Sequence, residues 1–282
     1  MQISEDIINR KGARKGTDIP RDVWILLNQG EIESVNLTEW LAVNHMTLIQ
    51  HVLPSVGLDH YIDDISSEIT KQKAESGMKA IRLIGQLLDE VLHEENEEKQ
   101  AEVLQAFAHH VSDSVRCWAA YMNKQHLSTL EEKLAYIQPF AADHHFGVRE
   151  IAWMSVRESL SHQLDQSIEY LTEWAKSGDE NIRRFSVESI RPRGVWTKHI
   201  ELLKQEPERA LPILNLLKSD LSTYVQDSVG NWLNDASKTQ PNWVMNLCEQ
   251  WSKESDTKAT SRIIKQAKRT ICEGESVNKS LN

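Results

Sequence analysis

Arginine side chains are concentrated in residues 181–196, which read NIRRFSVESIRPRGVW. Proline at position 192 biases the preceding residue away from the α-helical region, so a helix should end near Arg191 and continue as a turn. Guanidinium groups on a turn suit two-pronged contacts with phosphate, and an indole offers an aromatic face for a base or sugar. The segment therefore predicts an anion-binding surface made of Arg183, Arg184, Arg191, Arg193 and Trp196. In the alternative interpretation, these arginines clamp helices together through carbonyl and carboxylate groups.

A second polar cluster lies in residues 224–241, YVQDSVGNWLNDASKTQP. Asn231 and Asp235 are four residues apart and share one helix face, which Lys238 extends. Glu188 has an arginine four residues before it and another three residues after it, so we expect it to form salt bridges. Glu150 directly follows Arg149, but neighbours on a helix point apart. The three carboxylates therefore have different surroundings, and Asp235 has Lys238 as its one cation within a helical turn.

Metal and cofactor chemistry have little support in the sequence. The adjacent pairs His109-His110 and His144-His145 diverge by about 100° if they are helical, so two such histidines rarely share one ion. The sequence contains no P-loop, no GxGxxG and no GxSxG motif. We expect no bound metal and no cofactor.

Charge and composition restrict the partners of the protein. The 282 residues carry a formal net charge of −10, which by itself disfavours nucleic acid, because phosphate binding usually leaves a basic footprint. A solenoid can nevertheless carry acidic residues on its convex face and basic residues on its concave face. The sign reversal in residues 181–196 predicts such a separation of charge.

The cellular location is predicted from absent signals. The cysteines at 117, 248 and 272 are far apart and form no CxxC motif, which favours a reducing compartment. The N-terminus lacks the apolar stretch of a signal peptide, and the sequence has no apolar run that could span a membrane. We expect a cytoplasmic monomer that makes no membrane contact.

The elements that must position these side chains follow a repeat. Four similar apolar helices open on a Val or Ile, at spacings of 33, 34 and 43 residues, and the openers are Val115, Val148, Ile182 and Val225. Each is preceded by a polar turn and an earlier helix, predicted at residues 103–111, 134–140, 168–174 and 211–217. A fifth pair is expected at residues 244–251 and 263–271. This period is typical of helical solenoids, whereas a helical bundle without repeats is the alternative.

The repeat columns point to the C-terminal half. One residue after each opener stands Arg116, Arg149, Arg183 or Gln226. The face formed by the second and sixth residues after the opener is apolar in the first repeat and charged in the later ones. We therefore predict irregular helices in residues 1–75, a repeat array in residues 76–272 and a polar tail in residues 273–282, all within one structural domain.

Residues 143–156, DHHFGVREIAWMSV, together with the two polar segments, resemble DNA alkylation-repair glycosylases built from HEAT-like helical pairs. The resemblance covers roughly residues 103–270, and the RPR turn is more similar to the AlkC branch than to the AlkD branch. The N-terminal KGARKGTDIP also resembles family sequence. The resemblance implies an all-α, right-handed α-α superhelix, C-shaped, that grips double-stranded DNA in its concave channel.

The resemblance also implies an activity and a set of site residues. Active members release N3-alkylated cationic bases, and a carboxylate stabilises the positive sugar. In order of preference, the candidates are Glu150, Asp235 and Glu188. The family's helix-start arginine matches Arg184, its aspartate falls at Arg149 beside Glu150, and its tryptophans fall at His145 and at Asn231, beside Trp232. The predicted DNA-binding residues are therefore His145, Arg149, Arg183, Arg184, Arg191, Arg193, Trp196, Asn231, Trp232 and Lys238.

Three functions remain open on the sequence. The first is a glycosylase for alkylated bases. The second is a non-catalytic protein that recognises damaged or branched duplex DNA through the same channel. The third is a protein-interaction scaffold, a common use of HEAT-like arrays. The acidic net charge favours the scaffold, whereas the arginine segment and the resemblance favour DNA.

Overall fold

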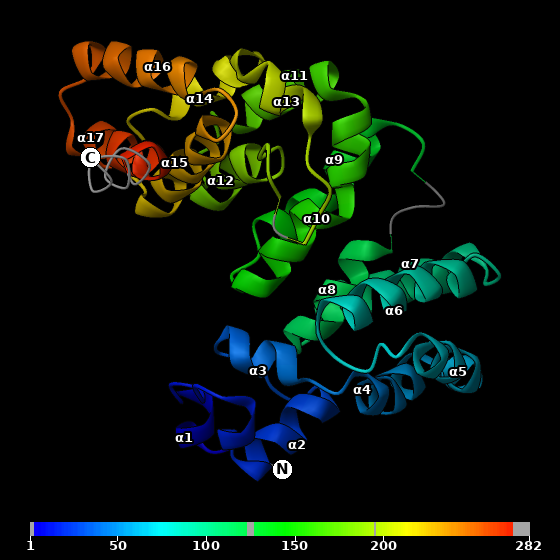
Figure 1. Cartoon of the computed structure of the whole chain (residues 1–282). Helices are drawn as coiled ribbons and strands as arrows, with labels where there is room; N and C mark the ends of the chain where they lie inside the picture. The colour runs from blue at the N-terminus through cyan, green and yellow to red at the C-terminus, as the bar shows by residue number, and fades with distance from the viewer. Residues whose placement is uncertain (1–2, 123–126, 195, 273–282) are drawn as a thin grey trace. The chain divides into compact units, whose positions relative to one another are not determined.

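The computed structural model describes residues 3–122, 127–194 and 196–272. Helices account for the regular structure of these residues, among which no β-strand occurs (Figure 1). The chain divides into two compact units, Met1–Ser155 and Val156–Asn282, and the division falls within α10 (Phe146–His162). The predicted all-α fold is confirmed. The predicted boundary near residue 75 stays a prediction, and the predicted tail of residues 273–282 lies outside the described residues.

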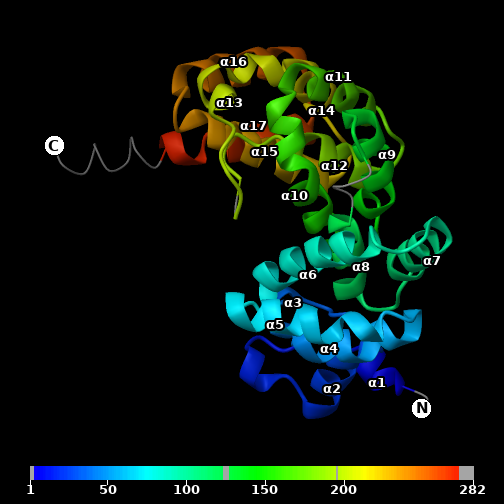
Figure 2. The ribbon, with the colours of Figure 1, turned by 90° about the vertical axis from the view of Figure 1, so that its right-hand side faces the viewer.

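The first unit begins with short, irregular helices and continues with longer ones. Their bounds are α1 Glu5–Ile8, η1 Gly16–Asp18, α2 Arg21–Gln29, α3 Leu37–Ala42, α4 His45–Val52, η2 Leu53–Val56, η3 Asp59–Tyr61, α5 Ile62–Gln72, α6 Gly77–Leu92, α7 Glu97–Ala108, α8 Asp113–Tyr121 and α9 Leu130–Ala141. Helices α4, α5 and α6 are stacked in that order (Figure 2). No helix of the described residues combines the length and apolarity that crossing a membrane requires.

Burial of an apolar stripe explains why α6 lies against α8. Ile81, Ile84 and Leu88 recur at helical spacing and are fully buried. Gly85 lies on the same helix, where a Cβ atom would come within 2.8 Å of the carbonyl oxygen of Trp118 in α8. A glycine is therefore required where these two helix backbones approach.

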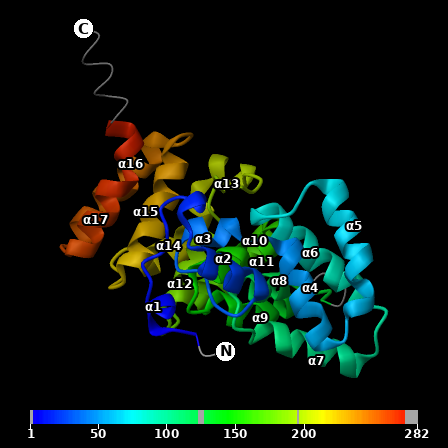
Figure 3. The same cartoon turned by 90° about the horizontal axis from the view of Figure 1, so that it is seen from below.

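The second unit contains the C-terminal end of α10 and the remaining helices. These are α11 Leu164–Trp174, α12 Glu180–Glu188, α13 Glu201–Gln205, η4 Pro207–Ala210, α14 Leu211–Leu217, α15 Thr223–Ser237, α16 Pro241–Glu254 and α17 Lys258–Ala267. Helix α15 packs against α12, α16 and α17 (Figure 3). Trp232 and Trp251 are fully buried in this unit, where their bulk fills the space between helical layers.

The repeat predicted from the sequence is confirmed. Each of the four openers is the third residue of its helix, in α8, α10, α12 and α15, and each is buried. The predicted upstream helices correspond to α7, α9, α11 and α14. The fifth pair corresponds to α16 and α17, although α17 ends at Ala267, before the predicted limit of residue 271.

The residue after each helix opener forms the same type of hydrogen bond to the backbone of the preceding turn. Arg116, Arg149 and Arg183 each donate hydrogen bonds from Nη1 to the carbonyl oxygens five and six residues earlier, at 2.7–3.1 Å. Gln226 donates from Nε2 to the carbonyl of Asp220, also six residues earlier, at 2.8 Å. We call this contact the turn clasp. It satisfies carbonyl groups that the end of the preceding helix leaves without helical partners.

Candidate functional site

Glu188, at the C-terminal end of α12, is held by three polar side chains. Its Oε1 accepts a hydrogen bond from Nη1 of Arg191 at 2.8 Å, and its Oε2 accepts one from the hydroxyl of Ser228 at 2.7 Å. Nη2 of Arg184 lies 3.8 Å from the same Oε2. The salt bridges expected from the i,i+3 and i,i+4 spacing are therefore confirmed, and Glu188 is only 5% exposed.

Asp235, in α15, is bound by the same arginine. Its Oδ2 accepts hydrogen bonds from both Nε and Nη2 of Arg191, at 2.9 and 2.7 Å. Lys238, one turn later, reaches Oδ1 at 3.1 Å. Arg191 therefore bridges two buried carboxylates that belong to two different helices. The sequence showed Lys238 as the neighbouring cation but missed Arg191, which comes from another repeat.

The charges in this cluster fix its protonation. Burial alone would raise the pKa of Glu188, but the positive charges of Arg184 and Arg191 and the hydrogen bonds that it accepts lower that pKa below its ordinary value. For Arg191, burial works against the charged form, yet the two carboxylates raise its pKa. The guanidinium carbon of Arg184 lies 4.4 Å from the centre of the Tyr224 ring, which adds a cation–π contact. Glu188 and Arg191 therefore stabilise each other's charged form.

Side chains from α10 and α15 bond the backbone carbonyl groups of the turn that follows α12. Arg157, from α10, donates to the carbonyl oxygen of Ser189 at 2.7 Å and also bonds the carbonyls of Arg191 and Lys198. Burial, and then the positive charge of Arg191, lower the pKa of Arg157 to about 10. The indole of Trp232 donates to the carbonyl of Ile190 at 3.1 Å.

This fixed turn presents Trp196 to solvent. The side chain is 61% exposed, and the residue has a left-handed φ of 60°. Most residues other than glycine avoid this backbone region. Arg193 lies on the same turn and is half-buried. Trp196 is thus exposed and Arg193 partly so, whereas the predicted anion-binding role of this surface stays a prediction.

The other predicted residues of the second unit are engaged within the fold. Trp232 is fully buried, so its ring faces the core. Asn231 accepts a hydrogen bond from Gln266 at 2.8 Å. Arg183 forms the turn clasp and an ion pair with Asp220 at 2.7 Å. This ion pair is the inter-repeat clamp that the alternative interpretation of the arginines described.

The first unit contains Glu150, Arg149 and His145. Glu150 is half-buried on α10 and accepts a hydrogen bond from the indole of Trp153 at 2.8 Å. Arg149 forms the turn clasp. His145 is buried, and its Nε2 lies 2.8 Å from the carbonyl oxygen of Ser34. Of these three predicted residues, Glu150 is the one that carries a carboxylate, and its side chain is half-buried.

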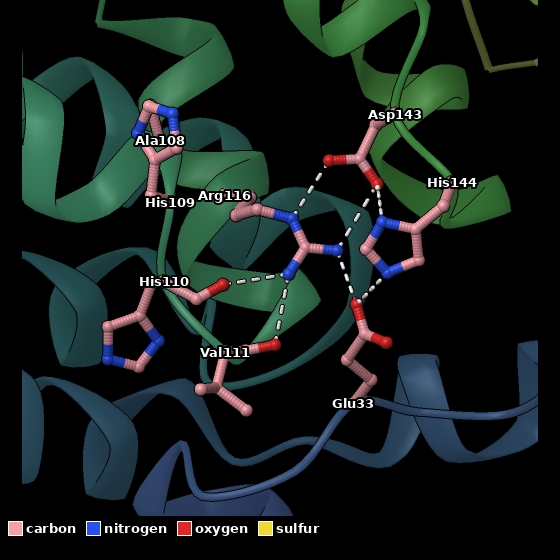
Figure 4. Close-up of a pocket in the computed structure, with 8 residues that line it drawn as sticks. All are labelled: Glu33, Ala108, His109, His110, Val111, Arg116, Asp143 and His144. Carbon is pink, nitrogen blue, oxygen red and sulfur yellow. Dashed lines mark hydrogen bonds and ion pairs between the residues drawn. The ribbon is translucent and has the colours of Figure 1, made fainter.

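A polar hollow of about 440 Å³ also lies in the first unit (Figure 4). Arg116 reaches across it to Asp143 at 2.9 Å and to Glu33, and His144 contacts Glu33 at 2.7 Å. The charged groups that line this hollow thus pair with one another. They join the start of α8 and the turn before α10 to Glu33 in the N-terminal segment. Within the described ranges, no cluster of three His, Cys, Asp or Glu side chains could hold a metal ion.

Sequence reasoning missed Ser228, Tyr224 and Arg157. Ser228 and Tyr224 reach Glu188 and Arg184 from α15, and Arg157 reaches the turn from α10. Each lies more than thirty residues from its partner, so no local spacing could reveal the contact.

Stacked helical pairs joined by turn clasps define an α-solenoid of the HEAT-like class. The sequence profile of the family described as DNA alkylation repair enzyme matches residues 58–269, and the chain belongs to this family. The resemblance seen in the sequence is thereby confirmed. The chain is 36% identical over 151 residues to the uncharacterized protein YhaZ of Bacillus subtilis, a match that covers 54% of this chain and 40% of YhaZ.

Two solved structures share the fold. The alkylpurine DNA glycosylase AlkC of Pseudomonas fluorescens, bound to DNA containing an abasic site analog, gives a TM-score of 0.61 at 21% identity. This match covers 80% of this chain and 61% of AlkC, so the chain spans less than two thirds of either AlkC or YhaZ. AlkD2 of Streptococcus mutans gives 0.54 at 23% identity and covers 72% of this chain and 97% of AlkD2.

Proposed function

We propose that this protein is a DNA glycosylase that releases positively charged, alkylated bases from double-stranded DNA. Membership in the DNA alkylation repair enzyme family supports the proposal, as does the shared fold with an alkylpurine DNA glycosylase. The structural observation that carries it is the exposed indole of Trp196, which follows a turn braced by the Glu188–Arg191–Asp235 cluster. This arrangement combines an aromatic face with the half-buried guanidinium side chain of Arg193, in a protein whose net charge is −10.

The chemistry places modest demands on the protein. A base that carries a positive charge is already a good leaving group, and it departs with the electron pair of its bond to the sugar. A water molecule then forms the new bond to the sugar carbon and releases a proton. The protein must supply an ionised carboxylate that stabilises the positive sugar while this exchange takes place.

Glu150 remains our first candidate for this carboxylate. It is half-buried, so it combines partial exclusion of water with access, and the indole of Trp153 holds its orientation. Asp235 and Glu188 rank second and third, because both already neutralise Arg191. Their charge is therefore balanced within the protein, which reduces what they can offer to a positive sugar.

The remaining predicted residues divide into contact groups and supporting groups. We assign Arg184, Arg193, Trp196 and Lys238 to DNA contact. The turn clasps of Arg149 and Arg183 add positive charge while they hold the repeats. His145, Arg191, Asn231 and Trp232 support these residues from within the fold. The same proposal has the protein act as a cytoplasmic monomer without a cofactor.

The test is a release assay on a duplex that contains one N3-methyladenine, with a duplex of unmodified adenine as its control. The expected result is release of the methylated base alone. A protein that binds both duplexes and releases nothing would instead be a non-catalytic DNA binder. The internal pairing of Glu188 and Asp235 with Arg191 is the observation that favours this second function.

A further inference from the structure

A loop near the N-terminus carries the densest positive charge of the first unit. Residues 10–21, RKGARKGTDIPR, contain five basic residues and one acidic residue, in a chain with a net charge of −10. The structure places this basic loop between α1 and the start of α2, and it includes η1. The proposed glycosylase function assigns it no role.

The first residue of the basic loop anchors it to α3. Arg10 donates from Nη2 and Nε to the carboxylate of Glu39 at 2.7 and 3.0 Å, and this carboxylate is fully buried. The same guanidinium bonds the carbonyl oxygens of Ile7 and Glu33 at 2.7 Å. A buried, fully hydrogen-bonded ion pair fixes the position of the chain on both sides of it.

Two hydrogen bonds and a glycine conformation hold the centre of the basic loop. Asn36 donates from Nδ2 to the carbonyl of Ala13 at 2.9 Å, and Thr38 donates to the carbonyl of Arg14 at 3.3 Å. Gly12 has a left-handed φ of 73°, and a side chain there would collide with Asn36. The backbone of the loop is therefore ordered by α3 and the residue before it.

The other cations of the basic loop point away from these anchors. Lys11, Arg14, Lys15 and Arg21 are exposed, and none of them forms an ion pair within the described part of the chain. Like charges on an ordered loop repel one another, which costs stability. The net negative charge of the protein already favours solubility, so these unpaired cations are not needed for that purpose. They are suited to contact with an anionic partner.

Helix α3 connects the basic loop to the helix that carries Glu150. The ring of Trp40, near the end of α3, packs edge-on against Phe146 at the start of α10, with ring centres 5.9 Å apart. A Cβ atom on Gly147 would lie 2.8 Å from the same indole. Asn36 and Thr38, which hold the basic loop, and Trp40, which contacts Phe146, lie within five consecutive positions, so this segment links the basic loop to the first turn of α10.

We infer that the basic loop is a second DNA-binding element, which contacts the backbone phosphates of the duplex beside the start of α10. The inference rests on the proposed function, because duplex DNA is the partner. Lysine ammonium groups and arginine forks replace the counterions of phosphate and require no particular base sequence. The loop thereby positions DNA next to the helix of Glu150, while Arg10, Gly12, Asn36 and Thr38 keep it in place.

The experiment measures binding of an unmodified fluorescent duplex by the full chain, over a series of salt concentrations. The test variant is K11A/R14A/K15A. The control K71A/K176A/K253A also removes three positive charges, from exposed lysines that form local ion pairs. We expect the test variant to bind at least about tenfold more weakly at 0.1 M salt. Its plot of log Kd against log salt should be shallower by about 2 to 3, because each lost phosphate contact contributes about 0.9.

One further variant separates charge from folding. K11R/R14K/K15R keeps the charges and should bind as the wild type does. If instead K11A/R14A/K15A and the wild type have equal Kd and equal salt slopes, the inference is wrong. A wild type that binds no DNA would overturn both the inference and the proposed function. Loop-dependent binding without base release would uphold the inference and contradict only the glycosylase.

A membrane surface is the other anionic partner that the experiment must separate. Trp24 and Ile25 follow the basic loop and are 41% and 38% exposed, so an interfacial contact is a physical alternative. Vesicles of phosphatidylcholine with phosphatidylserine provide this arm. Vesicle binding that is lost in K11A/R14A/K15A, with DNA binding unchanged, would overturn the inference.

Discussion

Arg191 and Asp235 lie 44 residues apart in the sequence and are joined by two hydrogen bonds, both to Oδ2 of the carboxylate. The third nitrogen of the guanidinium group bonds Glu188. One arginine therefore holds the end of α12, the turn after it and the middle of α15 together. The surface that presents Trp196 depends on this connection.

Replacing Arg191 with alanine should destabilise the protein by about 3 kcal/mol, because two buried carboxylates lose their shared partner. Urea unfolding followed by circular dichroism measures the change. Arg209, which forms exposed ion pairs with Asp165 and Glu206, provides the control, and Arg209→Ala should change the stability little. Equal stability losses in the two variants would show that the Arg191 cluster contributes no more than a surface pair.

Glu188 should make stability depend on pH in the acid range. The folded-state pKa lies below the ordinary value of 4.5, so the folded protein binds fewer protons than the unfolded chain there. The stabilisation is fully present above pH 4.5 and is lost as the pH falls through the folded-state pKa. The difference in unfolding free energy between wild type and Glu188→Gln should therefore shrink between pH 6 and about pH 3. A difference that stays constant over this range would contradict the lowered pKa.

The turn clasp predicts an order of stability among variants of Arg183. Arg183→Ala removes the clasp and the ion pair with Asp220, and should cost about 2 to 3 kcal/mol. Arg183→Gln should cost less, since Gln226 forms the clasp in the next repeat with an amide. Thermal unfolding of both variants tests this order. Equal melting temperatures would mean that the clasp contributes nothing beyond the ion pair.

Arg184 and Arg116 should differ in their effect on DNA binding. Arg184 stacks on Tyr224 beside Glu188, whereas Arg116 forms a turn clasp and also ion pairs with Asp143 and Glu33. We expect Arg184→Ala to weaken binding of a duplex roughly tenfold at 0.1 M salt, the loss of about one phosphate contact. Arg116→Ala should weaken it less. Fluorescence anisotropy at matched salt measures both, and equal effects would remove Arg184 from the interface.

Local patterns explain what the sequence could predict. The helix openers were found because a buried Val or Ile after a polar turn recurs in every repeat. The salt bridges of Glu188 were found because their partners are three and four residues away on one helix. The bond between Arg191 and Asp235 was beyond such reasoning, since it depends on how one repeat packs on the next.

The arginines that follow the helix openers show a different limit of prediction from sequence, because charge alone does not reveal the role of a side chain. Arg149 and Arg183 were predicted to contact DNA because their charge is visible in the sequence, yet both fold back onto carbonyl groups of their own turns. Gln226, which follows the fourth helix opener where the other repeats have arginine, indicated the structural role of this position. Where an uncharged amide replaces arginine in a repeat, hydrogen bonding is the shared property, and it predicts a structural contact.

On the proposed function, the protein releases a charged base with help from a carboxylate on α10. The most direct test is single-turnover release of N3-methyladenine from a duplex by the wild type and by Glu150→Gln, with the binding of both proteins measured on the same duplex. We predict release by the wild type and a rate lower by about a hundredfold or more in the variant, with binding unchanged, because the electrostatic stabilisation is lost. No release by the wild type would contradict the glycosylase, and equal rates would contradict the role of Glu150.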